Sequence, residues 1–597
     1  MESEDSIIAK ANYWANSEAF DEHTRSEISD LIESRNTQEL NDRFYRDLTF
    51  GTGGMRGIMG AGSCRMNIYN IRKATTALAL YLKECHRSRT EPVRVAIAWD
   101  SRNRSFDFAR HAAEVLAAHG IEVITLKEMR PVPVLSFMVR HFKCQAGICI
   151  TASHNPPAYN GFKVYWETGG QLTPPHDKNI IAYYDRIQNY EGLDYLDWDK
   201  AREQGLIKDV SEETDSEYLR EISKLSLNPQ GREGFRIAYS PIHGTGIYAV
   251  PAALEAFGFK DIVIPPEQKE PDGDFPTVSS PNPEDPEALV MALNLAREKN
   301  AHLVLATDPD SDRIACIVNE NGQFISFDGN QLICLMTEYI LSSLNEQNRI
   351  PENPLVVTTV VTSPLHQKIA EHYGVQCDVT LTGFKWICQR INDYEEGRLG
   401  VQRNFICGGE ESYGFLCGSF VRDKDAVSSC ALAAEMVAWY RHKGLLLSDV
   451  LESIYARHDL YRDRLYNLVL PGKKGAERFE KIMDYFRQSP PDSIGSYQVT
   501  SLSDILTDVV YKKEDGDWVK AGDTGLPSSN VLQFDLGPKV RFSVRPSGTE
   551  PKIKFYFSMA KSTGGKKGPE QTKLRKELEQ DLMALEKQVL KLVDSIS

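Results

Sequence analysis

Short apolar, β-rich runs alternate with helical stretches along most of the chain, and this alternation constrains the fold more than any other feature. VRVAIAWD (93–100) is followed by a helical stretch at 106–120 and then by IEVITL (121–126). Similar cycles begin at FRIAYSPI (235–242) and LVVTTVVT (355–362). Repeated strand–helix–strand patterns predict α/β domains, and they argue against a β-sandwich or a helix bundle.

The last part of the chain departs from this pattern. Residues 539–559 contain two β runs around a polar turn, and a helix with a stripe of apolar residues follows: Leu578, Leu582, Leu585, Val589, Leu592 and Ile596. The stripe is shorter than a coiled coil usually needs. We therefore expect the helix to pack against its own sheet, with a dimer contact as the alternative.

Length and composition limit the classes of function. The chain has 597 residues, which is enough for about four domains, and we place them at 1–226, 227–347, 348–465 and 466–597. The net charge of -15 argues against nucleic acid and anionic membranes as partners. No signal peptide or membrane span is predicted, and the 11 scattered cysteines lack zinc-ligand spacing. These features favour a reduced, cytoplasmic protein.

An acidic turn follows the apolar run AHLVLAT. Asp308, Asp310 and Asp312 occupy alternate positions there, and their mutual repulsion would be relieved by a hard cation such as Mg²⁺. An EF-hand is excluded because Arg313 and Asn319 stand where that loop needs Gly and Glu. A solvated acidic turn is one alternative. A haloacid-dehalogenase-like phosphotransferase with Asp308 as nucleophile is another, although Asp312 favours a third metal ligand.

Three further motifs carry groups suited to sugar phosphates. Ser153 and His154 follow the predicted strand AGICI, where an α/β sheet commonly places its chemistry. The turn RPSGTEP offers a guanidinium fork, two hydroxyls and a glycine, a combination that suits phosphate: Arg545, Ser547, Gly548 and Thr549. GGEESYG supplies paired acceptors for vicinal hydroxyls, and Lys424 downstream is suited to a phosphate. Taken singly, each motif has a plain alternative: a loop serine beside a structural histidine, a β-hairpin turn, and a solvated acidic loop, respectively.

GTGIYA (244–249) fits the glycine pattern of a dinucleotide-binding turn, because it lies between a strand and a helix. The acidic residue that such a site needs about 20 residues later is not cleanly placed. Dinucleotide binding is therefore disfavoured.

TASHNP, DPDSDR, GEESYG and RPSGTEP, in this order, resemble the motifs of the α-D-phosphohexomutase superfamily, over about residues 45 to 560. The likeness is greatest to the phosphoglucomutase-like group that includes phosphopentomutases. The resemblance implies four domains around a central cleft. Three would be similar α/β domains with a mixed sheet between helices, and the fourth a smaller α+β domain.

The resemblance also implies roles for individual residues. Ser153 would be the phosphoserine, and it would contact an Mg²⁺ ion held by the three aspartates. Lys163, with His154 nearby, would act in proton transfer. The remaining implied residues would bind substrate: Arg56, Arg313, Thr382, Gly383, Glu410, Ser412, Lys424, Arg545, Ser547, Gly548 and Thr549.

The implied activity is interconversion of glucose 1-phosphate and glucose 6-phosphate through a bisphosphorylated sugar, with a sugar 1,6-bisphosphate as primer. Mannose or pentose phosphates are alternative substrates, and a non-catalytic sugar-phosphate sensor is the alternative from another class. The intact Ser153 and the three aspartates argue against a sensor. The partner would be a small sugar phosphate, and the protein a monomer or a homodimer.

Overall fold

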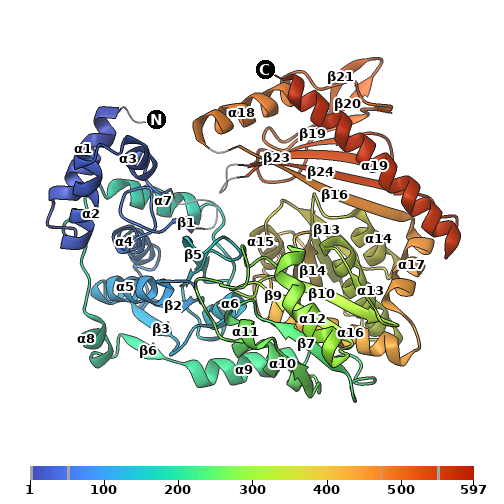
Figure 1. Cartoon of the computed structure of the whole chain (residues 1–597), viewed down its shortest axis with the longest axis horizontal. Helices are drawn as coiled ribbons and strands as arrows, with labels where there is room; N and C mark the ends of the chain where they lie inside the picture. Colours follow the sequence, from blue (N-terminus) through green and yellow to red (C-terminus); the bar gives the residue numbers. More distant parts are fainter. Residues whose placement is uncertain (1–3, 50–53, 471, 548–551, 597) are drawn as a thin grey trace. The chain divides into compact units, whose positions relative to one another are not determined.

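The computed structural model describes residues 4–49, 54–470, 472–547 and 552–596 (Figure 1). The chain forms two compact units. The first comprises residues 1–326 and 414–439, and the second comprises residues 327–413 and 440–597. The chain passes between the units three times, the last time within helix α16 (Ala426–His442).

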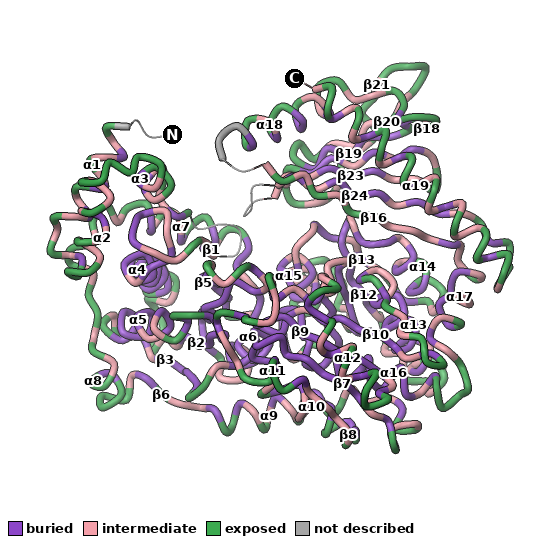
Figure 2. The backbone as a smooth tube through the Cα atoms, in the orientation of Figure 1, coloured by how far each residue is buried: buried purple, intermediate pink, exposed green. Residues whose placement is uncertain are grey.

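The first unit contains a six-stranded mixed sheet in the order β1-β5-β4-β2-β3-β6. Its strands are β1 (Gly54–Ile58), β2 (Arg94–Trp99), β3 (Glu122–Thr125), β4 (Ala146–Ile150), β5 (Tyr159–Trp166) and β6 (Ile207–Asp209). Its helices are α4 (Ile68–Cys85), α5 (Ser105–Ala118), α6 (Val132–His141), α7 (His176–Arg186), α8 (Trp198–Glu203) and α9 (Ser211–Ser223). Every residue of β4 is buried, as expected for a central strand between helices. Its neighbour β2 is also mostly buried (Figure 2).

A second mixed sheet in the same unit has the order β11-β10-β9-β7-β8. It comprises β7 (Arg236–Ser240), β8 (Asp261–Val263), β9 (Leu303–Thr307), β10 (Ile314–Glu320) and β11 (Gln323–Ser326). The accompanying helices are η1 (Thr245–Tyr248), α10 (Val250–Ala256), α11 (Pro266–Lys269), η2 (Pro286–Leu289) and α12 (Val290–Lys299). Strand β9 is also buried throughout, so the acidic turn that follows it begins at a fixed point of the core.

Three helices precede the first sheet: α1 (Glu4–Asn16), α2 (Glu22–Glu33) and α3 (Thr37–Phe44). Trp14 and Phe20 stack with ring centroids 4.1 Å apart, and both rings contact Tyr69 of α4 and Tyr190 edge-on or tilted. This aromatic cluster attaches the N-terminal helices to the first α/β domain.

The second unit begins with a third α/β domain. In it, β12 (Pro354–Thr359) pairs in parallel with β13 (Gln376–Thr380) and β14 (Asn404–Glu410). The helices are α13 (Gly329–Glu346), α14 (Pro364–His372), α15 (Phe384–Glu395) and α17 (Leu447–His458). After β14 the chain returns to the first unit with β15 (Gly414–Cys417).

The rest of the second unit is an antiparallel sheet in the order β16-β24-β23-β22-β19-β20-β21. Its strands are β16 (Leu460–Val469), β19 (Ser501–Asp504), β20 (Val509–Glu514), β21 (Asp517–Gly522), β22 (Leu532–Asp535), β23 (Val540–Pro546) and β24 (Lys552–Lys561). The hairpin β17 (Ser493–Ile494) and β18 (Tyr497–Gln498) is separate, and the helices are α18 (Gly472–Gln488) and α19 (Pro569–Ser595). This domain has the α+β composition that the sequence predicts.

The apolar stripe of α19 packs on β16 and β24, so the prediction that this helix covers its own sheet is confirmed. Leu578, Leu582, Leu585 and Val589 are buried. The stripe then continues at Val593 rather than at Leu592. A straight α-helix has 3.6 residues per turn, so a heptad stripe drifts around the helix, and the buried position moves by one residue.

The α/β character of the first three domains is also confirmed. The region 267–288, which the sequence predicts to be irregular, contains residues 267–269 of α11 and 286–288 of η2 and is otherwise irregular. Among the described residues, no helix has the length and apolar character needed to cross a membrane.

Candidate active site

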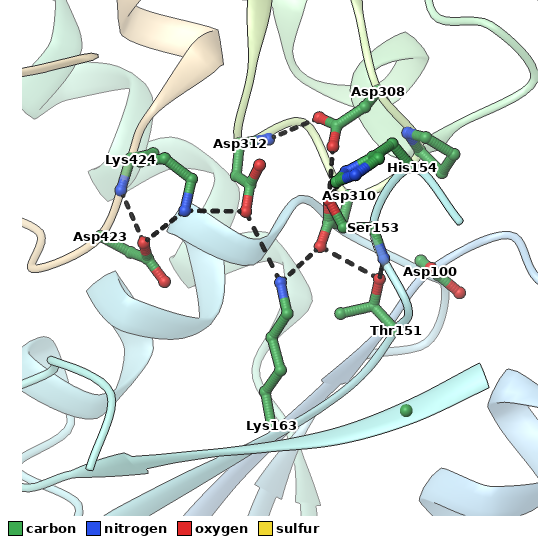
Figure 3. Close-up of polar contacts among 12 residues, drawn as sticks. Asp100, Thr151, Ser153, His154, Lys163, Asp308, Asp310, Asp312, Asp423 and Lys424 are labelled. Carbon is green, nitrogen blue, oxygen red and sulfur yellow. Dashed lines mark hydrogen bonds and ion pairs between the residues drawn. The ribbon is translucent and has the colours of Figure 1, made fainter. Parts of the chain in front are cut away.

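The first group of site residues lies in the first unit, at the carboxyl ends of β4 and β9 (Figure 3). Ser153 is 3% exposed, and its Oγ donates a hydrogen bond to Asp308 Oδ2 at 2.7 Å. His154 Nδ1 lies 3.2 Å from the same Oγ. The Ser153 backbone N–H donates to Thr151 Oγ1 at 2.8 Å, which fixes the start of the loop. The structure thus brings the predicted nucleophile to the predicted metal site.

The acidic turn folds back on itself. Asp308 Oδ1 accepts hydrogen bonds from the backbone N–H groups of Asp312 and Arg313, both at 3.0 Å. One carboxylate oxygen from each of the three aspartates lies within 4.8 Å of one from each of the other two, so the three side chains can hold one ion.

The residues present fit a hard cation. Asp310 Oδ1 and Asp312 Oδ1 are buried and have no hydrogen-bond partner among the described residues. Orphaned buried carboxylate oxygens are costly unless a cation satisfies them. Oxygen ligands in this number suit Mg²⁺, so Asp308, Asp310 and Asp312 are the residues that would hold it.

Two lysines lie against the same carboxylates. Lys163 Nζ on β5 is 2.8 Å from Asp310 Oδ2 and 3.5 Å from Asp312 Oδ2. Lys424 Nζ is 3.1 Å from Asp312 Oδ2 and 3.4 Å from Asp423 Oδ1. Lys424 is predicted from the sequence to contact a substrate phosphate, and in this structure its ammonium group lies at the acidic turn.

The electrostatics of the turn follow from these contacts. Burial, reinforced by the charges of Asp312 and Asp310, raises the pKa of Asp308 well above its usual range. Burial acts in the same direction on Asp312, but the cations Lys424, Lys163 and Arg313 outweigh it and hold the pKa of Asp312 below its usual range. Burial opposes a charged Lys163, yet the neighbouring carboxylates raise its pKa above that of a free lysine.

The predicted arginines have different surroundings. Arg56 on β1 donates from Nη1 to Asn155 Oδ1 at 3.3 Å, so it lies beside the catalytic loop. Arg313 forms an ion pair with Glu284.

The glycines of the 244–249 turn pack against the acidic turn. A Cβ on Gly244 would lie 2.4 Å from Pro309 Cα, and one on Gly246 would lie 2.1 Å from Tyr239 Oη and 2.6 Å from Thr307 Oγ1. Thr245 Oγ1 donates to Pro309 O at 2.7 Å. This glycine pattern is therefore explained by close packing around the aspartates, without a dinucleotide.

The second group of site residues lies in the second unit. Glu410 is 6% exposed at the end of β14, and Thr382 and Gly383 follow β13. Burial and the charge of Glu410 raise the pKa of Glu411 to about 7, although the charges of Lys554 and Arg545 act in the opposite direction. The loop that begins at Glu410 is therefore close to the cations of the C-terminal sheet.

Arg545 and Lys554 face each other across β23 and β24, and the Ser547 N–H closes the turn between these strands by donating to Lys552 O at 2.8 Å. Ser412 lies two residues beyond the end of β14. Two residues predicted for the distal phosphate, Gly548 and Thr549, lie outside the described residues.

Within the second unit, packing and a hydrogen bond hold the third α/β domain and the C-terminal sheet together. Leu381, Ile505 and Val531 form a buried apolar cluster between the third α/β domain and the C-terminal sheet. Gln533 Nε2 donates to Val360 O at 2.8 Å across the same junction.

Sequence reasoning missed several residues around the first group. Tyr165 Oη donates to Asp423 Oδ2 at 2.6 Å, and Asp423 in turn contacts Lys424 (Figure 3). Thr151 Oγ1 donates to Asp310 Oδ2 at 3.0 Å. Asp423 directly precedes the predicted residue Lys424 in the sequence, and this position is the one signal that could have marked it. Asp100 and Arg102 follow β2, and their position at the end of an apolar strand is a signal by which they could have been identified from the sequence.

A serine hydroxyl beside three clustered carboxylates and two ammonium groups defines a phosphoryl-transfer site. Comparisons with known proteins agree. Models of phosphoglucomutase/phosphomannomutase α/β/α domains I, II and III match residues 47–191, 216–322 and 328–458. The chain belongs to the phosphoglucomutase/phosphomannomutase family, and it is a mutase, an isomerase.

Curated relatives match over nearly their whole length. A phosphoglucomutase of Staphylococcus epidermidis is 33% identical over 89% of this chain and 94% of that protein. A phosphoglucomutase of Staphylococcus aureus is 34% identical over 89% and 93%.

Solved structures share the fold. The phosphoglucomutase parafusin from Paramecium has a TM-score of 0.61 at 17% identity, covering 91% of this chain and 95% of that one. A phosphoglucomutase/phosphomannomutase family protein from Burkholderia thailandensis has a TM-score of 0.60 at 17% identity, covering 90% and 97%.

Proposed function

We propose that the chain interconverts glucose 1-phosphate and glucose 6-phosphate through a phosphoserine at Ser153 and a bisphosphorylated sugar. The observation that carries this proposal is the hydrogen bond of 2.7 Å from Ser153 Oγ to Asp308 within the acidic turn. The choice of glucose is supported by relatives that are named phosphoglucomutase and match over most of the chain.

In the forward reaction, a hydroxyl of the sugar monophosphate attacks the phosphorus carried by Ser153. The new P–O bond forms as the bond to Ser153 Oγ breaks. The sugar hydroxyl gives up its proton as Ser153 Oγ gains one, and we assign this proton exchange to Lys163 and His154. Lys163 and Lys424 offset the negative charge of the phosphoryl group during this transfer. His154 lies within reach of Ser153 Oγ and is suited to exchange a proton there.

The bisphosphorylated sugar then turns over and returns its other phosphoryl group to Ser153. The groups that hold the sugar must therefore accept either end of it. We assign the hydroxyls to Glu410, Ser412, Thr382 and Gly383, and the non-reacting phosphate to Arg545, Ser547, Gly548 and Thr549. A guanidinium fork with hydroxyl and backbone donors recognises phosphate itself rather than one sugar carbon, which suits this requirement. Arg56 and Arg313 complete the proposed substrate contacts.

The proposed cofactor is Mg²⁺, which Asp308, Asp310 and Asp312 would hold beside Ser153. When bound, it supplies positive charge that stabilises the charge developing on the transferring phosphoryl group. A sugar 1,6-bisphosphate is the proposed primer, because an unphosphorylated Ser153 cannot start the cycle.

A coupled assay tests the proposal. Purified protein with Mg²⁺ and a trace of glucose 1,6-bisphosphate is given glucose 1-phosphate, and formation of glucose 6-phosphate is followed. Parallel assays use the corresponding mannose, glucosamine and ribose phosphates. Glucose 1-phosphate should give the highest kcat/KM of these substrates. A higher value with mannose or ribose phosphate would replace the proposed substrate, and no turnover of any of them would refute the mutase reaction for this chain.

The division into domains at 1–226, 227–347, 348–465 and 466–597 belongs to the proposal. A cytoplasmic location is also part of the proposal. It is supported by the scattered cysteines, none of which forms a disulfide in the structure. The oligomeric state is proposed only as monomer or homodimer.

A further inference from the structure

A buried arginine lies directly beneath the catalytic loop and takes part in none of the steps above. Arg102 follows β2 and is 3% exposed. Its Nη1 donates to the backbone carbonyls of Pro156 at 2.9 Å and Tyr159 at 3.0 Å. Its Nη2 donates to the carbonyls of Ser153 at 2.5 Å and Asn155. One guanidinium group therefore satisfies four carbonyls of a single loop.

The loop needs such support because its backbone is strained at the nucleophile. Ser153 has φ 52°, in the left-handed region that residues other than glycine rarely occupy. Such a conformation is energetically unfavourable and persists only where the surroundings determine it. In this conformation the Ser153 hydroxyl is directed to Asp308.

Arg102 is itself held on two sides. Asp100 Oδ1 accepts hydrogen bonds from the Arg102 N–H at 3.0 Å and from Ser105 Oγ at 2.7 Å, and Asp100 Oδ2 lies 3.4 Å from Arg102 Nε. On the other side, the centre of the Phe275 ring lies 5.1 Å from the guanidinium carbon, within the range of a cation–π contact. Phe275 is fully buried.

Phe275 belongs to the proline-rich segment 270–284, whose role the sequence leaves unexplained. The segment is packed tightly against the residues after β2, because a Cβ on Gly273 would lie 2.3 Å from Asn103 N. Asn103 Nδ2 donates to Asp274 at 2.6 Å. Further along, Ser280 Oγ donates to the backbone carbonyl of His154 at 3.0 Å. The segment thus contacts both Arg102 and the catalytic loop.

We propose that Arg102 is a positioning residue for phosphoryl transfer: clamped between Asp100 and Phe275, it fixes the carbonyls of the catalytic loop and so holds Ser153 in its left-handed conformation. This inference rests on the proposed function, because it concerns the rate at which Ser153 exchanges phosphate. A lysine cannot replace the arginine here, because its single ammonium cannot reproduce a planar fork of donors.

The test uses the full chain with four variants. Arg102→Lys keeps the charge and removes the fork, and Phe275→Leu keeps Arg102 and removes the ring. Arg102→Ala leaves a space in which added guanidinium ion can bind. Arg104→Lys is the matched control, because the Arg104 side chain is 46% exposed two residues away. For each variant, kcat and KM for glucose 1-phosphate and the unfolding midpoint are measured.

We expect kcat to fall about 100-fold in Arg102→Lys and about tenfold in Phe275→Leu, with KM within threefold of wild type, because misplacing a reacting group costs rate rather than binding. Guanidinium ion should raise the kcat of Arg102→Ala at least tenfold, and Arg104→Lys should match wild type. Wild-type kcat in Arg102→Lys would overturn the inference. A second result would also overturn it: both Arg102 variants lose activity only in proportion to their loss of folded protein, Phe275→Leu keeps wild-type kcat, and guanidinium ion restores no activity. A wild-type chain without any mutase activity would instead refute the proposed function.

Discussion

At the scale of single residues, the arrangement of charge in the acidic turn determines what the site can bind. Three carboxylates lie close enough together to hold one ion, and Lys163 and Lys424 offset only part of their charge. Affinity for a hard cation depends on the number of charged oxygen ligands. We therefore expect the loss of charge at any one of these aspartates to weaken binding of Mg²⁺.

Asp312→Asn should raise the Mg²⁺ concentration needed for half-maximal activity at least tenfold, because one of three charged ligands becomes neutral. The requirement is measured by titrating Mg²⁺ into metal-free protein in the coupled assay. Asp194→Asn, at an exposed position, is the control and should leave the titration unchanged. An unchanged titration for Asp312→Asn would remove this residue from the metal site.

Gly246→Ala should lower the free energy of unfolding by about 1–3 kcal/mol, a typical cost of overpacking a buried position. The added methyl group would overlap Tyr239 Oη and Thr307 Oγ1 next to the acidic turn, so the affinity for Mg²⁺ should fall as well. Denaturant titration measures the first effect and Mg²⁺ titration the second. Gly522→Ala is the control, because a Cβ there meets nothing within 4 Å. Equal stability of the two variants would contradict the packing argument.

Residues that stand at the ends of apolar strands could be predicted from the sequence, because an α/β sheet places such positions at one edge. Ser153 and Asp308 are of this kind, and the structure places Ser153 Oγ 2.7 Å from Asp308 Oδ2. Lys424 could be identified as a site residue but not located, because its contact with Asp312 depends on how distant segments pack. The carbonyl contacts of Arg102 leave no mark in the sequence, since backbone carbonyls are common to all residues.

At the scale of helices and strands, burial of one apolar face accounts for α19. Leu585 is 1% exposed, whereas Met583, two residues earlier on the same helix, is 51% exposed. Leu585→Ala should destabilise the second unit by about 2–5 kcal/mol, and Met583→Ala should change its stability by less than about 0.5 kcal/mol. Both changes in stability are measured by denaturant unfolding of the full chain, with hydrogen exchange as the probe of the second unit. Similar effects of the two substitutions would show that α19 is not held by this face.

Helix α14 should make the second unit sensitive to acid. His366 is fully buried, its Nε2 contacts Thr337 Oγ1 at 2.8 Å, and burial lowers the pKa of His366 to about 4. The unfolded histidine has a pKa of about 6.5, so below that pH the unfolded chain binds a proton that the folded chain excludes. The contribution of His366 to the free energy of unfolding is therefore complete above about pH 6.5. It falls by about 3 kcal/mol as the pH drops towards 4.

Unfolding curves of wild type and His366→Gln between pH 4 and 8 measure this contribution. The difference in stability between the two proteins should depend on pH, because glutamine does not titrate. A constant difference across that range would show that His366 does not contribute to the acid sensitivity.

Most strands and helices could be predicted from local pattern, but their order in a sheet could not. The sequence predicts β2, β3 and β4, yet their arrangement with β4 beside β2 follows from crossover packing between distant segments.

At the scale of the whole molecule, the contacts group the chain into two compact units. The division into four domains stays a prediction, and packing between domains is what composition cannot reveal. In the second unit, the cluster of Leu381, Ile505 and Val531 joins the third α/β domain to the C-terminal sheet. The proposed sugar and phosphate residues of this unit are therefore positioned together.

The central claim is that phosphate resides on Ser153 and moves from there to the sugar. The most direct measurement is the mass of the intact protein after incubation with glucose 1,6-bisphosphate and Mg²⁺, followed by peptide mapping. A species about 80 Da heavier, the mass of one phosphoryl group, should appear. The label should map to Ser153, survive acid, and be lost on addition of glucose 6-phosphate. Ser153→Ala should lose both the label and turnover. A label on Asp308 that hydroxylamine removes, or normal turnover by Ser153→Ala, would contradict the account.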